Sequence, residues 1–316
     1  MALRNSLFAV SGKASFLDAR RDMSGLFVCD NTTMMPIAGI LDRSQDNLVT
    51  GNSNSMSVTV HPFNAVLNRY GALLLQNDGN ANVPLSAAPS ANSRIDVVYV
   101  KQNETRSPMS DSSDNPIFGV VRGVAAATPV APDVPDGALA LAQVLLPAGV
   151  SNTAAAGVVI TQTYIGAALK GDMLRVQTSA QRDALTTVPE GTLLHNVADN
   201  CDYVRKGDGW RGWNMTWCDI HFGSNKVYMW ASNGVAYVDV STATINLTGW
   251  GSTVNVGQVN NSAFYPVASE GVYAPTRDNY FPTTASVTTD GHVSIGYAGG
   301  PSGNRIVSTI FSYYIG

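Results

Sequence analysis

Apolar and polar residues alternate with a period of two through the first half of the chain. The segment "SMSVTV" places Met56, Val58 and Val60 on one face of an expected strand, and Pro62 ends it. Apolar runs of strand length, bounded by Gly, Pro, Asn or Asp, follow at 71–76, 95–102, 117–124, 138–146 and 157–164. The pattern predicts a β-rich N-terminal domain over residues 1–165.

Helical periodicity occurs at two places. In "ASFLDARRDM" (14–23), Phe16, Ala19, Arg20 and Met23 recur at the spacing of one helix face. In "TSAQRDAL" (178–185), a threonine and a glutamine have the spacing of a capping box, which predicts a helix of two turns. Because the remaining apolar segments are short and bounded by turns, we expect an all-β protein with little helix.

The second half divides into a small module and a head. Residues 166–219 hold the short helix, the strands 192–197, 201–206 and 209–217, and a hairpin signal at Asp208-Gly209. Residues 220–316 contain apolar runs at 226–232, 235–240, 243–248, 285–289, 292–298 and 306–315, and Asp290-Gly291 marks a two-residue hairpin. Short strands at this spacing predict a sandwich or jelly-roll head.

One predicted strand, "RIDVVYVKQN" (94–103), carries two charges at its start. Arg94 and Asp96 share a face with valines because side chains alternate along a strand. The pair is either a catalytic carboxylate beside a tuning cation or a structural ion pair. No partner acid, base or pocket is evident near it in the sequence, so we predict a structural pair.

Composition narrows the classes of partner. Only 13% of residues are charged, the net charge is -4, and the chain has five lysines, so no basic stripe for nucleic acid is present. No apolar stretch reaches the ~18 to 20 residues of a membrane span, and no secretory signal is recognisable. We therefore expect synthesis in a cytoplasm, no membrane insertion and no nucleic-acid partner. The sparse set Cys29, Cys201 and Cys218 predicts free thiols; a bridge between Cys201 and Cys218 is the alternative.

The motifs of common catalytic sites are missing. The run "GNSNSM" leads into a strand rather than a helix, and "GGPSGN" lacks the spacing of a nucleophile elbow. The four histidines are scattered, so we expect no metal site, no cofactor and no enzyme. A glycosidase would need two carboxylates within about 5 to 10 Å; the candidates are Asp208, Asp219, Asp239, Asp278, Asp290 and Glu270.

Aromatic residues are the best candidates for a binding site. Flat aromatic faces stack on the apolar side of sugar rings, and the aromatic residues concentrate in and just after the small module. The alternative is that they fill a core or an inter-subunit seam. The candidate carbohydrate-binding residues are Trp213, Trp217, Tyr228, Trp230, Tyr237 and Trp250.

Several segments, in order, resemble a known family. "RIDVVYVKQ" (94–102) and "VPDGALALAQVLLPAGV" (134–150) resemble the N-terminal anchoring part of tail-tip and baseplate receptor-binding proteins of siphophages, especially those infecting actinobacteria. "VQTSAQRDALTTVPEGTLLHNVADNCDYVRKGDGWRGW" (176–213) is similar to their linker or collar module. "FYPVASEGVYAPT" (264–276) and "ASVTTDGHVSIGYAGG" (285–300) are similar to their β-sandwich head.

The resemblance implies a function but no binding residues, because receptor-contacting positions in such heads vary with the host. It implies a homotrimeric tail fibre or baseplate component, located in the virion, with other phage tail proteins and a host cell-wall polysaccharide or glycan as partners. Residues 1–165 would anchor the protein, residues 166–219 would link, and residues 220–316 would bind the receptor. The alternatives are a tail-associated polysaccharide depolymerase and a purely structural tail component.

Overall fold

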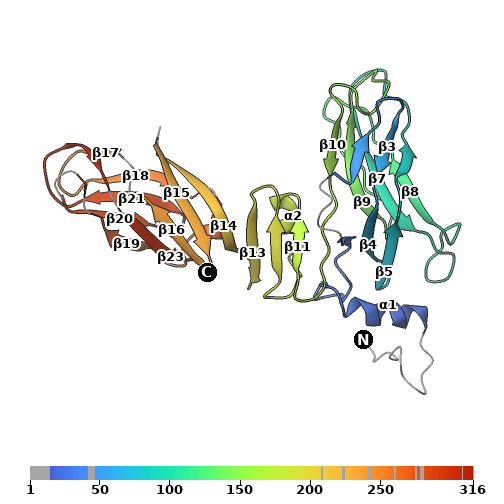
Figure 1. Cartoon of the computed structure of the whole chain (residues 1–316), viewed down its shortest axis with the longest axis horizontal. Helices are drawn as coiled ribbons and strands as arrows, with labels where there is room; N and C mark the ends of the chain where they lie inside the picture. The colour runs from blue at the N-terminus through green and yellow to red at the C-terminus, as the bar shows by residue number, and fades with distance from the viewer. Residues whose placement is uncertain are drawn as a thin grey trace, which may run out of the picture. The chain divides into compact units, whose positions relative to one another are not determined.

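The computed structural model divides into two compact units, Met1–Thr192 (unit 1) and Leu193–Gly316 (unit 2) (Figure 1). It describes residues 15–41, 47–207, 209–222, 225–240, 244–259, 261–274, 276–277, 281–307 and 309–315, without the side chains of 214–228. Almost all regular elements are antiparallel strands, which confirms the all-β prediction. The boundary between the units falls within the expected small module 166–219, and the three-domain division stays a prediction.

Unit 1 contains three antiparallel sheets. The first joins β1 (Gly39–Ile40), β4 (Phe63–Asn68) and β5 (Ala72–Asn77). The second joins β2 (Val49–Gly51), β3 (Ser57–Val60) and β6 (Ala81–Pro84). The third has the order β10-β9-β7-β8, from Val159–Gln162, Leu139–Leu146, Arg94–Gln102 and Pro116–Val121. Each apolar run predicted as a strand in this unit overlaps one of these strands.

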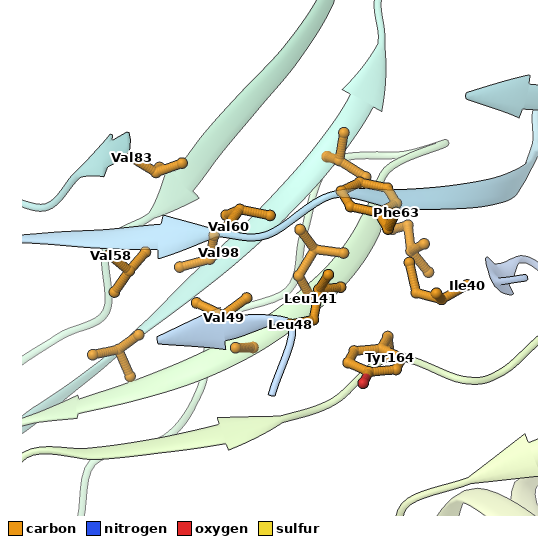
Figure 2. Close-up of a cluster of buried hydrophobic side chains, with 14 of the residues drawn as sticks. Ile40, Leu48, Val49, Val58, Val60, Phe63, Val83, Val98, Leu141 and Tyr164 are labelled. Carbon is orange, nitrogen blue, oxygen red and sulfur yellow. The ribbon is translucent and has the colours of Figure 1, made fainter. Parts of the chain in front are cut away.

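One apolar core joins the three sheets of unit 1. Side chains of β3 and β4, such as Val60 and Phe63, gather with Val98 of β7 and Leu141 of β9, and all four are at most 2% exposed (Figure 2). Burying a side chain of this size contributes about 1.5 to 3 kcal/mol. The buried apolar side chains on the inner faces of these strands therefore hold the three sheets together.

Strand β4 follows directly after Pro62 and lacks a clean alternation. Phe63, Ala65 and Leu67 enter the core between the sheets, whereas Val66 enters a second cluster with Phe27 and Ala167. Val66 is buried on the same face as the exposed Asn64 and Asn68, so three consecutive apolar residues interrupt the alternation. The sequence pattern missed β4 for this reason.

Both predicted helices are present in unit 1. Helix α1 (Phe16–Ser24) begins at Ser15, whose hydroxyl accepts from the Asp18 N–H while the Asp18 carboxylate accepts from the Ser15 N–H. Helix α2 (Ser179–Ala184) follows β11 (Met173–Val176), and the Thr178 hydroxyl accepts from the Gln181 N–H. The Gln181 side chain accepts from the backbone N–H of Gln177, the residue before the cap. In the predicted capping box it would have accepted from the N–H of the cap residue, Thr178.

Unit 2 contains two larger sheets and a short strand pair. In the first sheet, β12, β13, β14, β15, β16 and β23 are joined in that order, with bounds Leu193–Asn196, Cys201–Lys206, Gly209–Phe222, Asn225–Ser232, Val235–Asp239 and Ile310–Tyr314. The second sheet has the order β18-β21-β20-β19, from Thr253–Gln258, His292–Tyr297, Thr283–Val287 and Glu270–Tyr273. β17 (Thr244–Leu247) pairs with β22 (Gly303–Ile306). The sheets lie alongside each other in Figure 1, as expected for a sandwich.

Buried side chains alternate along the strands of unit 2. Tyr313 of β23 is 2% exposed, and its hydroxyl donates to the carbonyl of Phe264, which lies in the 3-10 turn Ser262–Phe264. The Phe264 ring contacts the ring of Tyr203 with a centroid distance of 5.8 Å. The core of this unit therefore also contains tyrosines whose hydroxyl groups are hydrogen-bonded.

One expected hairpin and one expected strand differ from the prediction. Asp290-Gly291 lies in a three-residue loop, because the Gly291 N–H donates to the Thr288 carbonyl and the Thr288 N–H to the His292 carbonyl. Gly291 has φ +80°, the left-handed position that follows a type I turn in such loops. The run 306–315 is divided between β22 and β23, since Ile306 pairs with Thr244 and Ile310 pairs with Asp239.

The turn between β13 and β14 is tight. Lys206 pairs with Gly209, so the loop consists of Gly207 and residue 208, which is outside the described residues. Cys201 pairs with Met215, while the backbone of Cys218 pairs with Met229. Cys29 is a buried free thiol, as predicted, and the side chain of Cys218 lies outside the described residues.

Candidate functional site

Two of the predicted aromatic residues form a cross-strand pair in unit 2. Trp230 on β15 pairs directly with Tyr237 on β16, and their rings stack at a centroid distance of 5.4 Å with 10° between planes. Their neighbours Ala231 and Ala236 point into the core, so both rings lie on the opposite face of the sheet. Both are partly exposed.

Strand β23 extends this face. Tyr314 pairs with Val235 and is 70% exposed, and Ile310 pairs with Asp239 and is 54% exposed. Beyond β23, the Val267 N–H donates to the Tyr314 carbonyl at 3.0 Å, and the Val267 side chain is also exposed. We call this surface the outer face; it consists of Trp230, Val235, Tyr237, Val267, Ile310 and Tyr314.

An open cleft of about 640 Å³ adjoins the outer face and shares Val267 with it. Two cationic side chains, Lys206 and Arg211, line the cleft together with Tyr265, and none of the described residues that line it is acidic. The Tyr265 hydroxyl accepts from the Gln258 amide at 3.1 Å, which fixes the ring at the rim. The surface thus offers aromatic rings beside hydrogen-bond donors, a combination that suits a hydroxylated ligand.

The other predicted aromatic residues have different positions. Trp213 is partly exposed on β14. Trp250 is 83% exposed in the loop between β17 and β18, where its ring lies near Gly299. The side chains of Trp217 and Tyr228 lie outside the described part of the chain. Among the candidate aromatic residues whose side chains are described, Trp230 and Tyr237 are the two whose rings contact each other.

The sequence interpretation missed Tyr314, Val267 and Ile310. A signal was available for two of them, because in "TIFSYYI" the residues Phe311 and Tyr313 alternate with Ile310, Ser312 and Tyr314. Only the strand order β15-β16-β23 shows that they share a face with Trp230, since β23 lies more than 70 positions later in the chain.

Arg94 and Asp96 are paired within the core of unit 1. Their side chains are 1% and 0% exposed, and the guanidinium Nε lies 2.9 Å from the Asp96 Oδ1. Arg94 also donates to the carbonyls of Ala87 and Ser86 at 2.7 and 2.6 Å, and Asp96 accepts from the Gly123 N–H at 3.0 Å. These hydrogen bonds attach the loop at Ser86 and Ala87, and the segment at Gly123, to the start of β7.

The three described carboxylates proposed for a glycosidase lie on different elements. Asp239 lies on β16 opposite Ile310, Glu270 is exposed on β19, and Asp290 lies in the β20–β21 loop. Hydrogen bonds from the Thr288 hydroxyl and from His292 hold the pKa of Asp290 below its usual value, whereas a general acid needs a raised one. Asp208, Asp278 and the Asp219 side chain lie outside the described residues.

Within the described residues, no group of three His, Cys, Asp or Glu side chains is arranged to hold a metal ion. No helix in the described part of the chain is long and apolar enough to cross a membrane. Comparison with protein-family models finds no match for this chain, and comparison with curated proteins finds none either.

Proposed function

We propose that this chain is a receptor-binding protein of a phage tail that attaches the virion to a host cell-surface carbohydrate. The observation that carries the proposal is the outer face of unit 2, where Trp230, Tyr237 and Tyr314 remain on the surface of an otherwise well-packed sheet. Contiguous apolar side chains on a surface mark interaction sites. Stacked rings with donors beside them match the apolar faces and hydroxyl groups of sugars.

The adjoining cleft supports a saccharide rather than a purely apolar partner. Lys206 and Arg211 provide donors and positive charge at its wall, and Tyr265 provides a further ring. A glycan chain can therefore lay a sugar on the outer face while a neighbouring hydroxyl or anionic substituent reaches the cleft.

In this proposal, unit 1 attaches to other tail proteins and three chains form the fibre. A shallow surface binds a single glycan weakly, but several copies on one virion engage the same cell surface. Avidity of this kind requires no deep pocket. The proposal requires that the outer face is not buried between subunits. In the alternative interpretation, the same aromatic residues lie in the contact between subunits.

The test measures binding of the full chain to a panel of immobilised bacterial cell-wall polysaccharides. We expect the wild type to bind at least one of them and the double variant Trp230→Ala, Tyr237→Ala to bind at least tenfold more weakly. The matched control is Tyr273→Ala, since Tyr273 is 59% exposed on β19 of the other sheet. Melting curves verify that each variant is folded.

Two results would overturn the proposal. One is a folded wild-type chain that binds no polysaccharide of the panel, as a purely structural tail component would. The other is a double variant that retains binding but dissociates into single chains, which would assign the outer face to a subunit seam. Loss of polymer from the panel during incubation would instead favour the depolymerase alternative.

A further inference from the structure

Unit 1 contains a cleft of about 480 Å³ that the outer face does not involve. It is lined by the β4–β5 turn, by the segment after β7 and by the loop before β9, with Arg69, Tyr70, Lys101, Met109, Asp111 and Asp136 among the lining residues. Nothing in the sequence pattern predicted it, because these residues are spread over almost 70 positions.

An ion-pair network includes three charged residues that line this cleft, Arg69, Lys101 and Asp111, and continues to Arg20 and Glu104. The Arg20 Nη1 lies 2.9 Å from a Glu104 oxygen, and the Arg69 Nε lies 3.1 Å from the same carboxylate. Asp111 pairs with Arg69 and, at 2.7 Å, with the Lys101 ammonium. All five side chains are at most 16% exposed. This degree of burial is tolerated because each charge faces an opposite one.

Two donors of this network are left over. The Arg69 side chain is 7% exposed, and neither its Nε nor its Nη1 makes a hydrogen bond with the described residues, although the Nε lies near the Glu104 carboxylate. The Nη1 lies against Gly137, because a Cβ on that glycine would be only 3.1 Å from it. A buried donor without a partner is costly, so such a group marks a place where a ligand atom can accept.

An aromatic ring stands beside this donor. Tyr70 lines the cleft, is 43% exposed and has φ +60°, a conformation that is unusual for a bulky residue. Helix α1 holds the turn in place, because Arg20 donates to the Arg69 carbonyl at 3.2 Å and Ser24 accepts from the Ala72 N–H at 2.8 Å. The strained residue is thus kept at the rim by its surroundings.

We propose that this cleft binds a neutral saccharide. Tyr70 offers a flat face for a sugar ring, Arg69 and Lys101 offer donors, and the Asp136 carboxylate offers acceptors for hydroxyl groups. Among the lining residues, an anion would meet Asp111 and Asp136, and a cation would meet Arg69 and Lys101. The hydroxyl groups of a neutral sugar both donate and accept hydrogen bonds, so such a ligand can bond to the cationic and to the acidic residues of the cleft.

The site is independent of the function proposed for unit 2, because every residue that forms it belongs to unit 1. Failure of the outer face to bind polysaccharide would leave this cleft untouched, and the reverse also holds. The two sites are separated by variants in the same full-length chain.

The test is ligand-observed NMR of the full chain with glucose, galactose, mannose, N-acetylglucosamine and their short oligomers, and with glucuronate as an anionic comparison. Tyr70→Asn removes the ring while keeping a residue that tolerates the left-handed backbone. Gly137→Ala places a methyl group against the Arg69 Nη1; because Gly137 has φ +72°, melting curves verify that this variant is folded. Tyr273→Asn, at an exposed position on β19 that belongs to neither site, is the matched control.

We expect at least one neutral sugar to bind the wild type and Tyr273→Asn equally, and to bind Tyr70→Asn at least tenfold more weakly. Gly137→Ala should weaken binding in the same direction. The proposal is overturned if no neutral sugar binds, if only glucuronate binds, or if folded Tyr70→Asn and Gly137→Ala bind as the wild type does. If Tyr314→Asn on the outer face loses sugar binding while Tyr70→Asn binds as the wild type does, all sugar binding lies on the outer face and the proposal is overturned.

Discussion

Arg94 places a guanidinium in the core of unit 1, where water cannot solvate it. Its charge is balanced by Asp96, and its remaining donors reach the carbonyls of Ser86 and Ala87. A buried ion pair adds little net stability relative to apolar residues of the same size. Removing one partner is different, because the remaining charge stays buried without compensation. The pair therefore fixes the start of β7 more than it strengthens the fold.

Asp96→Ala should lower the free energy of unfolding by about 3 to 5 kcal/mol, because Arg94 would remain buried and unpaired. Urea unfolding measures this loss. The double variant Arg94→Met, Asp96→Ala should be more stable than Asp96→Ala alone, since it removes the stranded charge. A single variant as stable as the wild type would contradict the structural role.

Asp111 makes unit 1 sensitive to acid. Burial raises the pKa of Asp111, but hydrogen bonds from Lys101 and from the Glu104 N–H, with the charge of Arg69, outweigh burial and leave the pKa below its usual value. A carboxylate of this kind stabilises the fold above its unfolded pKa of about 4. It loses that contribution as the pH falls through the lower, folded value.

The expected outcome is a free energy of unfolding that falls as the pH drops from 5 towards 2.5, with a shallower fall in Asp111→Asn. Denaturant unfolding at several pH values measures both slopes. Lys101→Met should also reduce the slope, because it removes the leading hydrogen bond to the carboxylate. Equal slopes in the wild type and in Asp111→Asn would be inconsistent with the lowered pKa.

At the level of elements, alternation along the chain predicted strands wherever one face was polar. β3 was found in this way, and Val58 and Val60 of its expected core face are buried, whereas β7 was predicted from a bounded apolar run. It missed β4 because Val66 and Phe63 enter different cores. It also joined two strands in 306–315, since a short apolar run does not show where pairing changes partner.

The β20–β21 loop depends on a glycine. Gly291 has φ +80°, and a Cβ there would lie 2.3 Å from the Tyr265 ring at the cleft of unit 2. Gly291→Ala should lower the free energy of unfolding by at least about 1 kcal/mol, because the left-handed backbone is costly for alanine. Thermal unfolding measures this change.

Gly271→Ala is the control for the loop, since its Cβ would make only an ordinary contact of 3.6 Å with Ser286 on the same sheet. It should change stability much less than Gly291→Ala. Equal stability of the two variants would show that neither the backbone of Gly291 nor the position of the Tyr265 ring constrains the loop.

At the scale of the whole molecule, the candidate sites are formed by residues far apart in the sequence. The aromatic residues Trp230 and Tyr237 were predicted as sugar-binding, and the register places them side by side. Their neighbour Tyr314 could not be placed without the strand order, and the cleft of unit 1 could not be placed without the position of α1 on the β4–β5 turn. Local pattern identifies residue types, but long-range pairing determines which of them meet.

The proposed fibre is a trimer, so the full chain should have a mass in solution close to three times the 33.3 kDa of one chain. Closed symmetric assemblies of this kind bury the same surface in each subunit. Sedimentation equilibrium over a wide concentration range measures the mass. A single-chain mass at every concentration would refute the trimer and remove the avidity on which weak glycan binding depends.

The most direct test of the central claim is binding of the labelled full chain to bacterial cells before and after mild periodate oxidation. Periodate cleaves vicinal diols of sugars and so destroys a carbohydrate receptor while leaving the cells countable. We predict that cells which capture the wild-type chain lose that capacity after oxidation, and that pretreating cells with protease leaves it intact. Binding that survives periodate and disappears after protease would contradict a carbohydrate receptor, as would failure to bind any cell of a broad panel.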